Sequence, residues 1–409
     1  MVCYFVTWYG SGILWYNVKQ LSCVSIPQTN PYHVGSTYHF FVQKNPVVVK
    51  NVATISLCMI VKNEEEYIAN CLNSVKDLVD EIIIVDTGST DNTEEIVSEY
   101  TNNIYFFDFT DDFSSARNYS FDKASKEYIF WLDADDVLQE EDRVKFKELK
   151  NRLDNEVGIV AMKYNYIFDD EDNVIFSFYK ERLIRRELKP LWVDPVHEYI
   201  IVDADIYKTD ITITHTRKNT QDERNLKIYK KFLYEGNELS QRGMMHYGME
   251  LLNNNLIQEA IFQLGKFLTI KSDWDSECEW VCLELSACYL KLHEYDNAIK
   301  ALLHCFEKCV PRAEICCEIG NCFVCKKEYD NATFWFELTV AMKKVRDDFS
   351  FVLDMYLDFI PNYQLGICHY SLGDIERAIY YNEEAIKAKP NNINARKNDT
   401  LYKKIQANA

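Results

Sequence analysis

The apolar and polar positions between residues 54 and 136 follow two alternating patterns. Short runs of β-branched and other apolar residues predict strands buried on both faces, and apolar residues at helical spacing between them predict helices. The expected strands cover 55–61, 82–85, 104–107 and 128–132, and the expected helices cover about 67–75, 89–100 and 113–124. Strands that alternate with helices through short connections predict a mainly parallel sheet with right-handed crossovers.

The pattern changes after residue 157. Runs at 157–162 and 174–179 read as strands around the acidic turn 169–173, and a last strand at 211–214 leads into His215. From about Asn219 to the end, the apolar residues recur only at helical spacing. We therefore expect an α/β domain followed by an all-α domain.

The helical part contains an internal repeat. A small residue and an alanine stand twelve positions apart four times: Gly248/Ala260, Ser286/Ala298, Gly320/Ala332 and Gly366/Ala378. The step from Ser286 to Gly320 is 34 residues, which is the period of a tetratricopeptide repeat. The repeat favours a solenoid of helix pairs over an irregular helical bundle.

The first 50 residues differ from the rest of the chain. They contain ten aromatic residues and no Asp or Glu, whereas the other 359 residues carry all 64 acids. The stretch lacks the basic start and clean apolar core of a signal peptide, so we expect a translated upstream stretch or a family-specific leader. The predicted division is an N-terminal extension at 1–52, an α/β domain at 53–218 and a helical-repeat domain at 219–409.

Charge and cysteine content limit the partners and the compartment. A net charge of −19 argues against a nucleic acid as the main partner. The sequence contains no run of about 18 apolar residues, so no transmembrane helix is predicted. The 14 cysteines are irregularly spaced in a long chain, which favours reduced thiols in a cytoplasmic protein. Cys322 and Cys325 have half of a zinc-site spacing, without a matching second pair.

Carboxylates follow two of the predicted parallel strands. Asp86 ends the second strand, and Asp133 and Asp135 follow the fourth. In open α/β sheets, ligands bind at the edge formed by the carboxyl ends of the strands. Alternate residues of an extended segment point to one side, so Asp133 and Asp135 can address one cation, and hard oxygen ligands suit Mg²⁺ or Mn²⁺. The alternative is an ordinary solvated acidic turn.

Five motifs in the right order show a family resemblance over about 160 residues. They are VKNEE at 61–65, VDTGSTD at 85–91, ARN at 116–118, DAD at 133–135 and VHE at 196–198. With these motifs the α/β domain resembles family 2 glycosyltransferases, whose nucleotide-sugar domain has the Rossmann-like GT-A fold. The most similar bacterial group includes lipopolysaccharide-core glucosyltransferases and, with helical repeats attached, peptide S-glycosyltransferases that modify bacteriocins.

The resemblance implies a role for each motif residue. It places Lys62 and Asn63 at the base and ribose of the nucleotide, and Asp86 and Thr87 in the base-binding turn. Many relatives have a second aspartate where Thr87 stands. It places Arg117 near the uracil and Asp133 near the ribose and the metal ion, and it makes Asp135 a direct ligand of the metal ion.

Inverting transfer also needs a base that takes the acceptor's proton. Glu198 and Asp194 are the carboxylates in the expected segment, and His197 is a candidate base, metal ligand or diphosphate contact. His215 is a further histidine candidate. Arg182, Arg185 and Arg186 either neutralise the diphosphate leaving group or form a solvated edge; both readings stay open.

The sequence thus predicts an inverting, metal-dependent glycosyltransferase. The expected donor is a UDP-sugar that carries a hexose or N-acetylhexosamine, and the expected acceptor is a peptide, a protein or a cell-envelope glycan. The repeats would hold the acceptor, form a homodimer or only cap the catalytic domain. The alternative is a non-catalytic repeat scaffold whose sugar-nucleotide domain has decayed.

Overall fold

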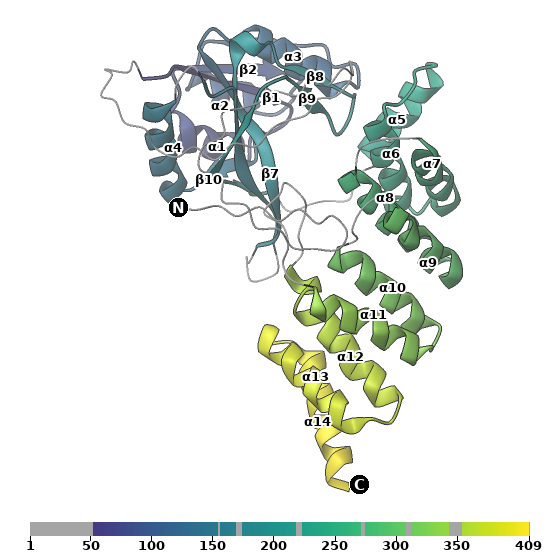
Figure 1. Ribbon diagram of the computed structural model, residues 1–409. Coiled ribbons are helices and arrows are strands. Elements are labelled where there is room, and N and C mark those ends of the chain that lie inside the picture. Colours follow the sequence, from purple (N-terminus) through teal and green to yellow (C-terminus); the bar gives the residue numbers. More distant parts are fainter. Residues whose placement is uncertain are drawn as a thin grey trace, which may run out of the picture. The chain divides into compact units, whose positions relative to one another are not determined.

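The structure is a computed structural model in which most of the chain after residue 51 is described (Figure 1). The described residues are 52–153, 156–168, 174–217, 223–270, 275–307, 312–342 and 354–408. The extension expected at 1–52 lies outside them apart from Val52, as do the acidic turn 169–173 and the predicted domain boundary at 218/219.

One eight-stranded sheet forms the framework of the first domain, in the order β3-β2-β1-β4-β7-β6-β10-β5. Its strands are β1 (Ile55–Val61), β2 (Glu81–Asp86), β3 (Ile104–Phe106), β4 (Tyr128–Trp131), β5 (Asp136–Leu138), β6 (Ile159–Phe168), β7 (Val174–Arg185) and β10 (Ile206–His215). A separate two-stranded sheet pairs β8 (Leu191–Val193) with β9 (Tyr199–Ile201).

The first four strands form the parallel half of the sheet, as the alternating β and α segments predict. Strand β1 pairs in parallel with both β2 and β4, and β2 pairs in parallel with β3. Almost every residue of β1, β2 and β4 is buried. This explains why these strands read as continuous apolar runs in the sequence.

The second half of the sheet is mixed and longer than its sequence pattern indicates. Strand β7 pairs antiparallel with both β4 and β6, while β10 pairs in parallel with β6 and antiparallel with β5. The runs expected at 157–162 and 174–179 extend to Phe168 and Arg185. The outer half of β6 is only partly buried and carries polar residues, and in β7 the charged residues 180–182, with Arg182 itself buried, interrupt the apolar run. Strand β5, directly after the acidic turn, has no counterpart in the expected elements.

Helices cover both faces of the sheet. They are α1 (Ile68–Val75), α2 (Thr93–Ser98), α3 (Phe113–Asp122) and α4 (Glu140–Arg152). Leu57, Ile84 and Phe130 belong to a core shared with α1, α2 and α4. Neighbouring residues of the same strands, such as Cys58 and Trp131, belong to a second core with α3 and β8. The sheet is therefore the middle of three layers, which confirms the predicted α/β fold class.

The second part of the chain is helical. Its helices are α5 (Arg224–Tyr234), α6 (Gln241–Asn253), α7 (Ile257–Thr269), α8 (Asp275–Lys291), α9 (Tyr295–Leu303), α10 (Ala313–Cys325), α11 (Tyr329–Ala341), α12 (Phe359–Ser371), α13 (Ile375–Ala388) and α14 (Ile393–Asn408). Helices α6 to α13 form four consecutive packed pairs, and α10 to α14 follow one another side by side (Figure 1).

The small residues of the repeat lie where the two helices of a pair meet. All four repeated alanines are 0% exposed. A Cβ atom on Gly248 would lie 2.4 Å from a methyl carbon of Leu264, and one on Gly320 would lie 2.7 Å from the ring of Phe336. The twelve-residue spacing thus places a residue without a bulky side chain on each of two touching helices, which confirms the predicted solenoid.

Two further expectations concern the described residues as a whole. Ten of the eleven cysteines that the structure describes are buried, and Cys325 is exposed. In the same part of the chain, no helix combines the length and the apolar character needed to cross a membrane.

Candidate active site

The carboxyl end of β2 holds a tight turn built on Asp86. The Asp86 side chain is 7% exposed, and its Oδ1 accepts hydrogen bonds from the backbone N–H groups of Gly88 and Ser89, both at 2.7 Å. Gly88 has φ of +101°, a conformation that favours glycine. The oxygen Oδ1 therefore holds the turn, and Oδ2 has no hydrogen bond to another described residue.

The turn after β1 is tied to the turn after β2. Asn63, at φ of 55°, accepts a hydrogen bond from the Thr90 N–H on Oδ1 at 2.7 Å and donates its own N–H to Ser89. The Thr87 hydroxyl donates to the carbonyl of Val61 at 3.0 Å. Asn63 and Thr87 thus shape these turns, while Lys62 is exposed beside them.

Arg117 joins residues from three separate segments. Its Nε donates to Glu198 Oε1 at 2.6 Å, and its Nη2 donates to Asp133 Oδ1 at 2.8 Å. The guanidinium also lies over the rings of Trp131 and Trp192, at 4.8 and 4.9 Å from the ring centroids. The structure therefore brings Arg117 together with two other predicted site residues, Asp133 and Glu198, which lie 16 and 81 positions away in the chain.

Cations hold Asp133 in its charged form. Burial favours the neutral acid, but the positive charges of Arg117, Lys180 and Arg182 keep the pKa of Asp133 well below its usual range. The Asp133 side chain is still 30% exposed. It can therefore contact a ligand as a carboxylate.

A second group of polar side chains surrounds Asp135. One Asp135 oxygen lies 3.4 Å from His215 Nδ1, and the other lies 2.9 Å from Arg217 Nε. The neighbouring Asp136 is 0% exposed and accepts hydrogen bonds from the Asp133 N–H and the Tyr164 hydroxyl. A site for a cation could form here, because ligand atoms of Asp135, Asp136 and His215 lie within 4.8 Å of one another.

The donor atoms of this group fit the divalent cation that the sequence predicts. Carboxylate oxygen and imidazole nitrogen together suit Mn²⁺. Asp136 already accepts hydrogen bonds from Tyr164 and a backbone N–H and forms an ion pair with Arg182. Asp135 and His215 are therefore the side chains best able to bind a metal ion. Burial alone would lower the pKa of His215, but hydrogen bonds to the two aspartates raise it to about 9. A metal ion would have to displace that proton.

Arg217 links the Asp135 group to the first turn. Besides Asp135, it pairs with the carboxylate of Glu64, which follows β1. Burial raises the pKa of Glu64 to about 7, although Arg217 opposes the shift and Asp135 adds to it. The acids at this edge thus repel one another, and Arg217 partly offsets that repulsion.

Asp194 and His197 point away from these two groups. Both have positive φ, 71° and 54°, so the segment before Glu198 is sharply turned. The Asp194 carboxylate accepts a hydrogen bond from Ser240 at 2.7 Å, and His197 Nε2 lies 2.9 Å from Glu250 Oε1 of α6. Of the three candidate bases, Glu198 is the one that contacts Arg117.

The arginines in the last part of β7 and directly after it have separate partners. Arg185 pairs with Glu187, and Arg186 donates to the carbonyl of Lys126, next to the start of β4. Arg182 is fully buried against Asp136 at 3.0 Å. These three arginines therefore leave the exposed part of the site to another cation.

That cation is Lys180, which the sequence interpretation missed. Its Nζ lies over the Trp131 ring, 4.9 Å from the centroid, and its charge acts on Asp133. Burial and the nearby charge of Arg182 lower the pKa of Lys180 to about 8. The signal was present, because side chains two positions apart in a strand share a face and Arg182 was already a candidate.

Comparison with known proteins adds the family. Residues 56–211 match the model of glycosyl transferase family 2, and residues 361–392 match a tetratricopeptide repeat. The chain carries a family 2 glycosyltransferase domain and tetratricopeptide repeats. The matched range contains the turns after β1, β2 and β4 together with Arg117 and Glu198, whereas His215 and Arg217 follow it. The expected combination of domains is confirmed.

Two relatives and one solved structure illustrate the similarity. The glycosyltransferase SunS of Bacillus subtilis is 26% identical over 58% of this chain and 59% of its own length. The lipopolysaccharide core biosynthesis glycosyltransferase LpsC of Rhizobium meliloti is 27% identical over 43% of this chain and 68% of its own length. The chain thus spans less than two thirds of SunS. The structure of S. aureus TarS 1–349 with UDP-GlcNAc has a TM-score of 0.37 and 16% identity, covering 61% of this chain and 90% of that chain.

Proposed function

We propose that this chain is an inverting glycosyltransferase that transfers a hexose or N-acetylhexosamine from a UDP-sugar. The observation that carries the proposal is the convergence of Arg117, Asp133 and Glu198 beside the Asp135–His215 pair, at the carboxyl edge of parallel strands. This charged group lies inside a family 2 domain or directly after it. A decayed domain would have no reason to retain so many buried charges at one edge.

In this proposal, the cations of the site bind the charged part of the donor. Arg117 pairs with Asp133, and the charge of Lys180 acts on the same carboxylate, so both cations can donate charge-assisted hydrogen bonds to phosphate oxygens beside it. Such bonds strengthen as negative charge develops on the departing diphosphate. The Asp86 turn and Asn63 would hold the base and ribose.

Asp135 and His215 would hold Mn²⁺ or Mg²⁺, with Asp133 and Asp136 close by. A divalent cation bound there supplies positive charge to the leaving diphosphate. Asp133 keeps its negative charge through Arg117, so it can orient the donor's ribose or the hydration shell of the cation.

We assign the general base to Glu198. Its Oε1 is fixed by Arg117, and no described residue bonds to its second oxygen, which is thus available to accept the acceptor's proton. Asp194 and His197 would instead set the position of Glu198, since they fasten the preceding turn to Ser240 and Glu250. The acceptor would be a peptide, a protein or a cell-envelope glycan.

Thermal unfolding with UDP and Mn²⁺ tests donor binding. The proposal predicts that UDP stabilises the chain only when Mn²⁺ is present, by about 2.7 kcal/mol at a hundredfold excess over the Kd. The Asp135→Asn variant should lose this effect. An Asp210→Asn variant should keep it, because Asp210 is 86% exposed on the same strand as His215. Stabilisation that is equal without metal, or none at all in the wild type, would favour the non-catalytic scaffold.

A further inference from the structure

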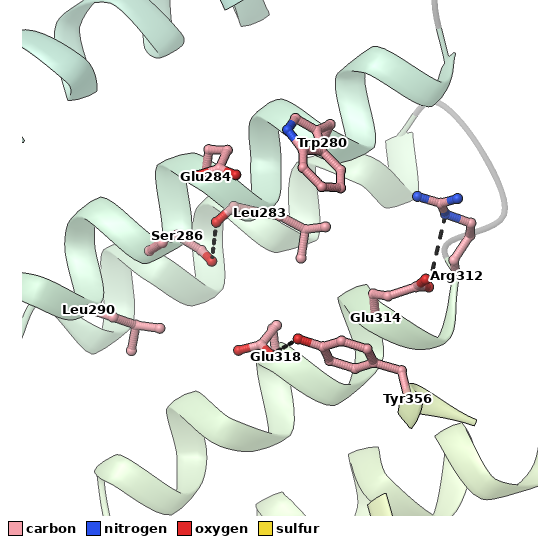
Figure 2. A pocket seen from close by; sticks show the side chains of 10 residues that line it. Trp280, Leu283, Glu284, Ser286, Leu290, Arg312, Glu314, Glu318 and Tyr356 are labelled. Atoms are coloured by element: carbon pink, nitrogen blue, oxygen red, sulfur yellow. Dashed lines mark hydrogen bonds and ion pairs between the residues drawn. The ribbon is translucent and has the colours of Figure 1, made fainter. Parts of the chain in front are cut away.

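A cavity of about 300 Å³ lies in the helical-repeat domain, far along the chain from the acid cluster of the sheet. Its walls are α8 and α10, the first helices of two successive repeats, and Tyr356 lines it beside Glu318 (Figure 2). A volume of this size lies at the lower limit of pockets that bind small ligands. It suits one or two amino-acid side chains better than a large ligand.

The α8 wall of the cavity is largely apolar. Trp280, Leu283 and Leu290 contribute side chains from one face of α8, with Ala287 between them. All three are partly buried and pack against the cores of the helix pairs, and the rest of their surface lines the cavity. Such a wall suits the methylene stem of a long side chain.

The polar part of the lining is acidic. Glu314 and Glu318 stand one turn apart on α10, so they share a face of that helix, and Glu284 belongs to α8. Among the lining residues that the structure describes, Arg312 is the one basic residue, and it also pairs with Glu279 at 2.8 Å. Three carboxylates thus face one cation whose charge is already shared.

Two of these carboxylates have no cationic partner among the described residues. Glu318 accepts a hydrogen bond from the Tyr356 hydroxyl at 3.0 Å, and Glu284 forms no hydrogen bond or ion pair within 4.0 Å to another described residue. Burial raises the pKa of the Glu284 carboxyl, and the more distant Lys291 only partly opposes this. Partly buried acids without partners lower stability unless a ligand completes the site.

We propose that this cavity binds a basic side chain of a polypeptide, with its aliphatic stem along Trp280 and Leu283 and its cationic head at Glu318. The cationic head would pair with carboxylates that have no cation within ion-pair distance among the described residues, and the stem matches the apolar wall. The occupant's chemistry is therefore a compact cation on a flexible hydrocarbon chain, as in lysine. This inference concerns binding alone and does not depend on glycosyl transfer.

Fluorescence anisotropy of the full-length chain with a labelled peptide provides the test. The probe is a nonapeptide with three lysines separated by alanines, and the comparison peptide carries Nε-acetyl-lysine at the same positions. We expect at least tenfold tighter binding of the lysine peptide at low salt, with a loss of affinity as salt screens the charges. Equal affinities for the two peptides would overturn the proposal.

Variants locate the binding in the cavity. Glu318→Gln should weaken binding of the lysine peptide at least tenfold, because the amide can still accept the Tyr356 hydrogen bond but has no charge. Glu284→Gln is a second variant, which removes a charge that burial disfavours and should therefore fold. Glu376→Gln is the matched control, as Glu376 is exposed on α13. An equal loss in Glu376→Gln, or no loss in both cavity variants, would contradict the assignment.

Free cadaverine separates a polypeptide from a small diamine as the occupant. It has the carbon chain and terminal ammonium of lysine but no peptide backbone, and it carries a second ammonium in place of the backbone amide. If the cavity serves a polypeptide, cadaverine should compete at least tenfold more weakly than the unlabelled peptide. Competition at equal or lower concentration would overturn the polypeptide assignment.

Discussion

Arg117 shows how much one side chain can determine in this domain. It is 8% exposed, lies over two tryptophan rings that also contact each other, and bonds to two carboxylates. A guanidinium suits this position because its fixed N–H groups reach both acids while its planar faces contact the rings. Removing it would take away the hydrogen bonds that hold Asp133 and Glu198, with Lys180 and Arg182 left as the cations that act on Asp133.

Lys180 gives the site a predicted dependence on pH. Its pKa of about 8 means that the ammonium form is present below pH 8 and is lost as the pH rises. If the ammonium binds the donor's diphosphate, kcat/KM should fall above pH 8. Measuring the rate from pH 6 to 10 at low donor concentration gives kcat/KM at each pH and so follows the titration of Lys180.

Two substitutions and one control identify the group. Lys180→Arg keeps the charge and should move the fall in kcat/KM to higher pH. Lys180→Met should lower kcat/KM at pH 7 by about 10- to 100-fold, because a hydrogen bond to a charged group contributes about 1.5–3 kcal/mol. Lys163→Met, at an exposed position of the adjacent strand, should change little. An unchanged fall at pH 8 in Lys180→Arg would show that another group titrates.

At the scale of elements, strand pairing assembles the Asp135 group. Antiparallel pairing of β10 with β5 sets His215 opposite Asp136, although 79 positions separate them. The sequence marks the acids and the histidine as candidates, but a three-residue strand such as β5 has no periodicity that could reveal this register. The grouping of His215 with Asp135 therefore had to come from the structure.

The helix pairs show the opposite case, in which local spacing predicts packing. Gly320→Ala would place a Cβ 2.7 Å from Phe336 and should destabilise the chain by about 1–3 kcal/mol. Gly265→Ala is the matched control, since a Cβ there meets nothing within 4 Å, and it should stabilise α7 by about 0.5–1 kcal/mol. Denaturant titration measures both. Equal effects of the two substitutions would mean that α10 and α11 do not pack this closely.

At the scale of the whole molecule, the sequence predicts the domain types more fully than the site. The parallel strands β1 to β4 and the repeat alanines are visible because their environments are uniform along the chain. The directions in which the Asp194 and His197 side chains point are not visible in the sequence, because both residues have positive φ and their partners lie at the start of α6 and within it. Such long-range partners leave no periodic trace in a single sequence.

The most direct test of the central claim is turnover of a panel of UDP- and GDP-sugars with Mn²⁺, measured as release of the nucleoside diphosphate. The account predicts that the wild type and Asp210→Asn turn over one UDP-sugar, and that Asp135→Asn does not. If no donor is turned over, or if Asp135→Asn is as active as the wild type, then the acid cluster at the sheet edge is not the catalytic site.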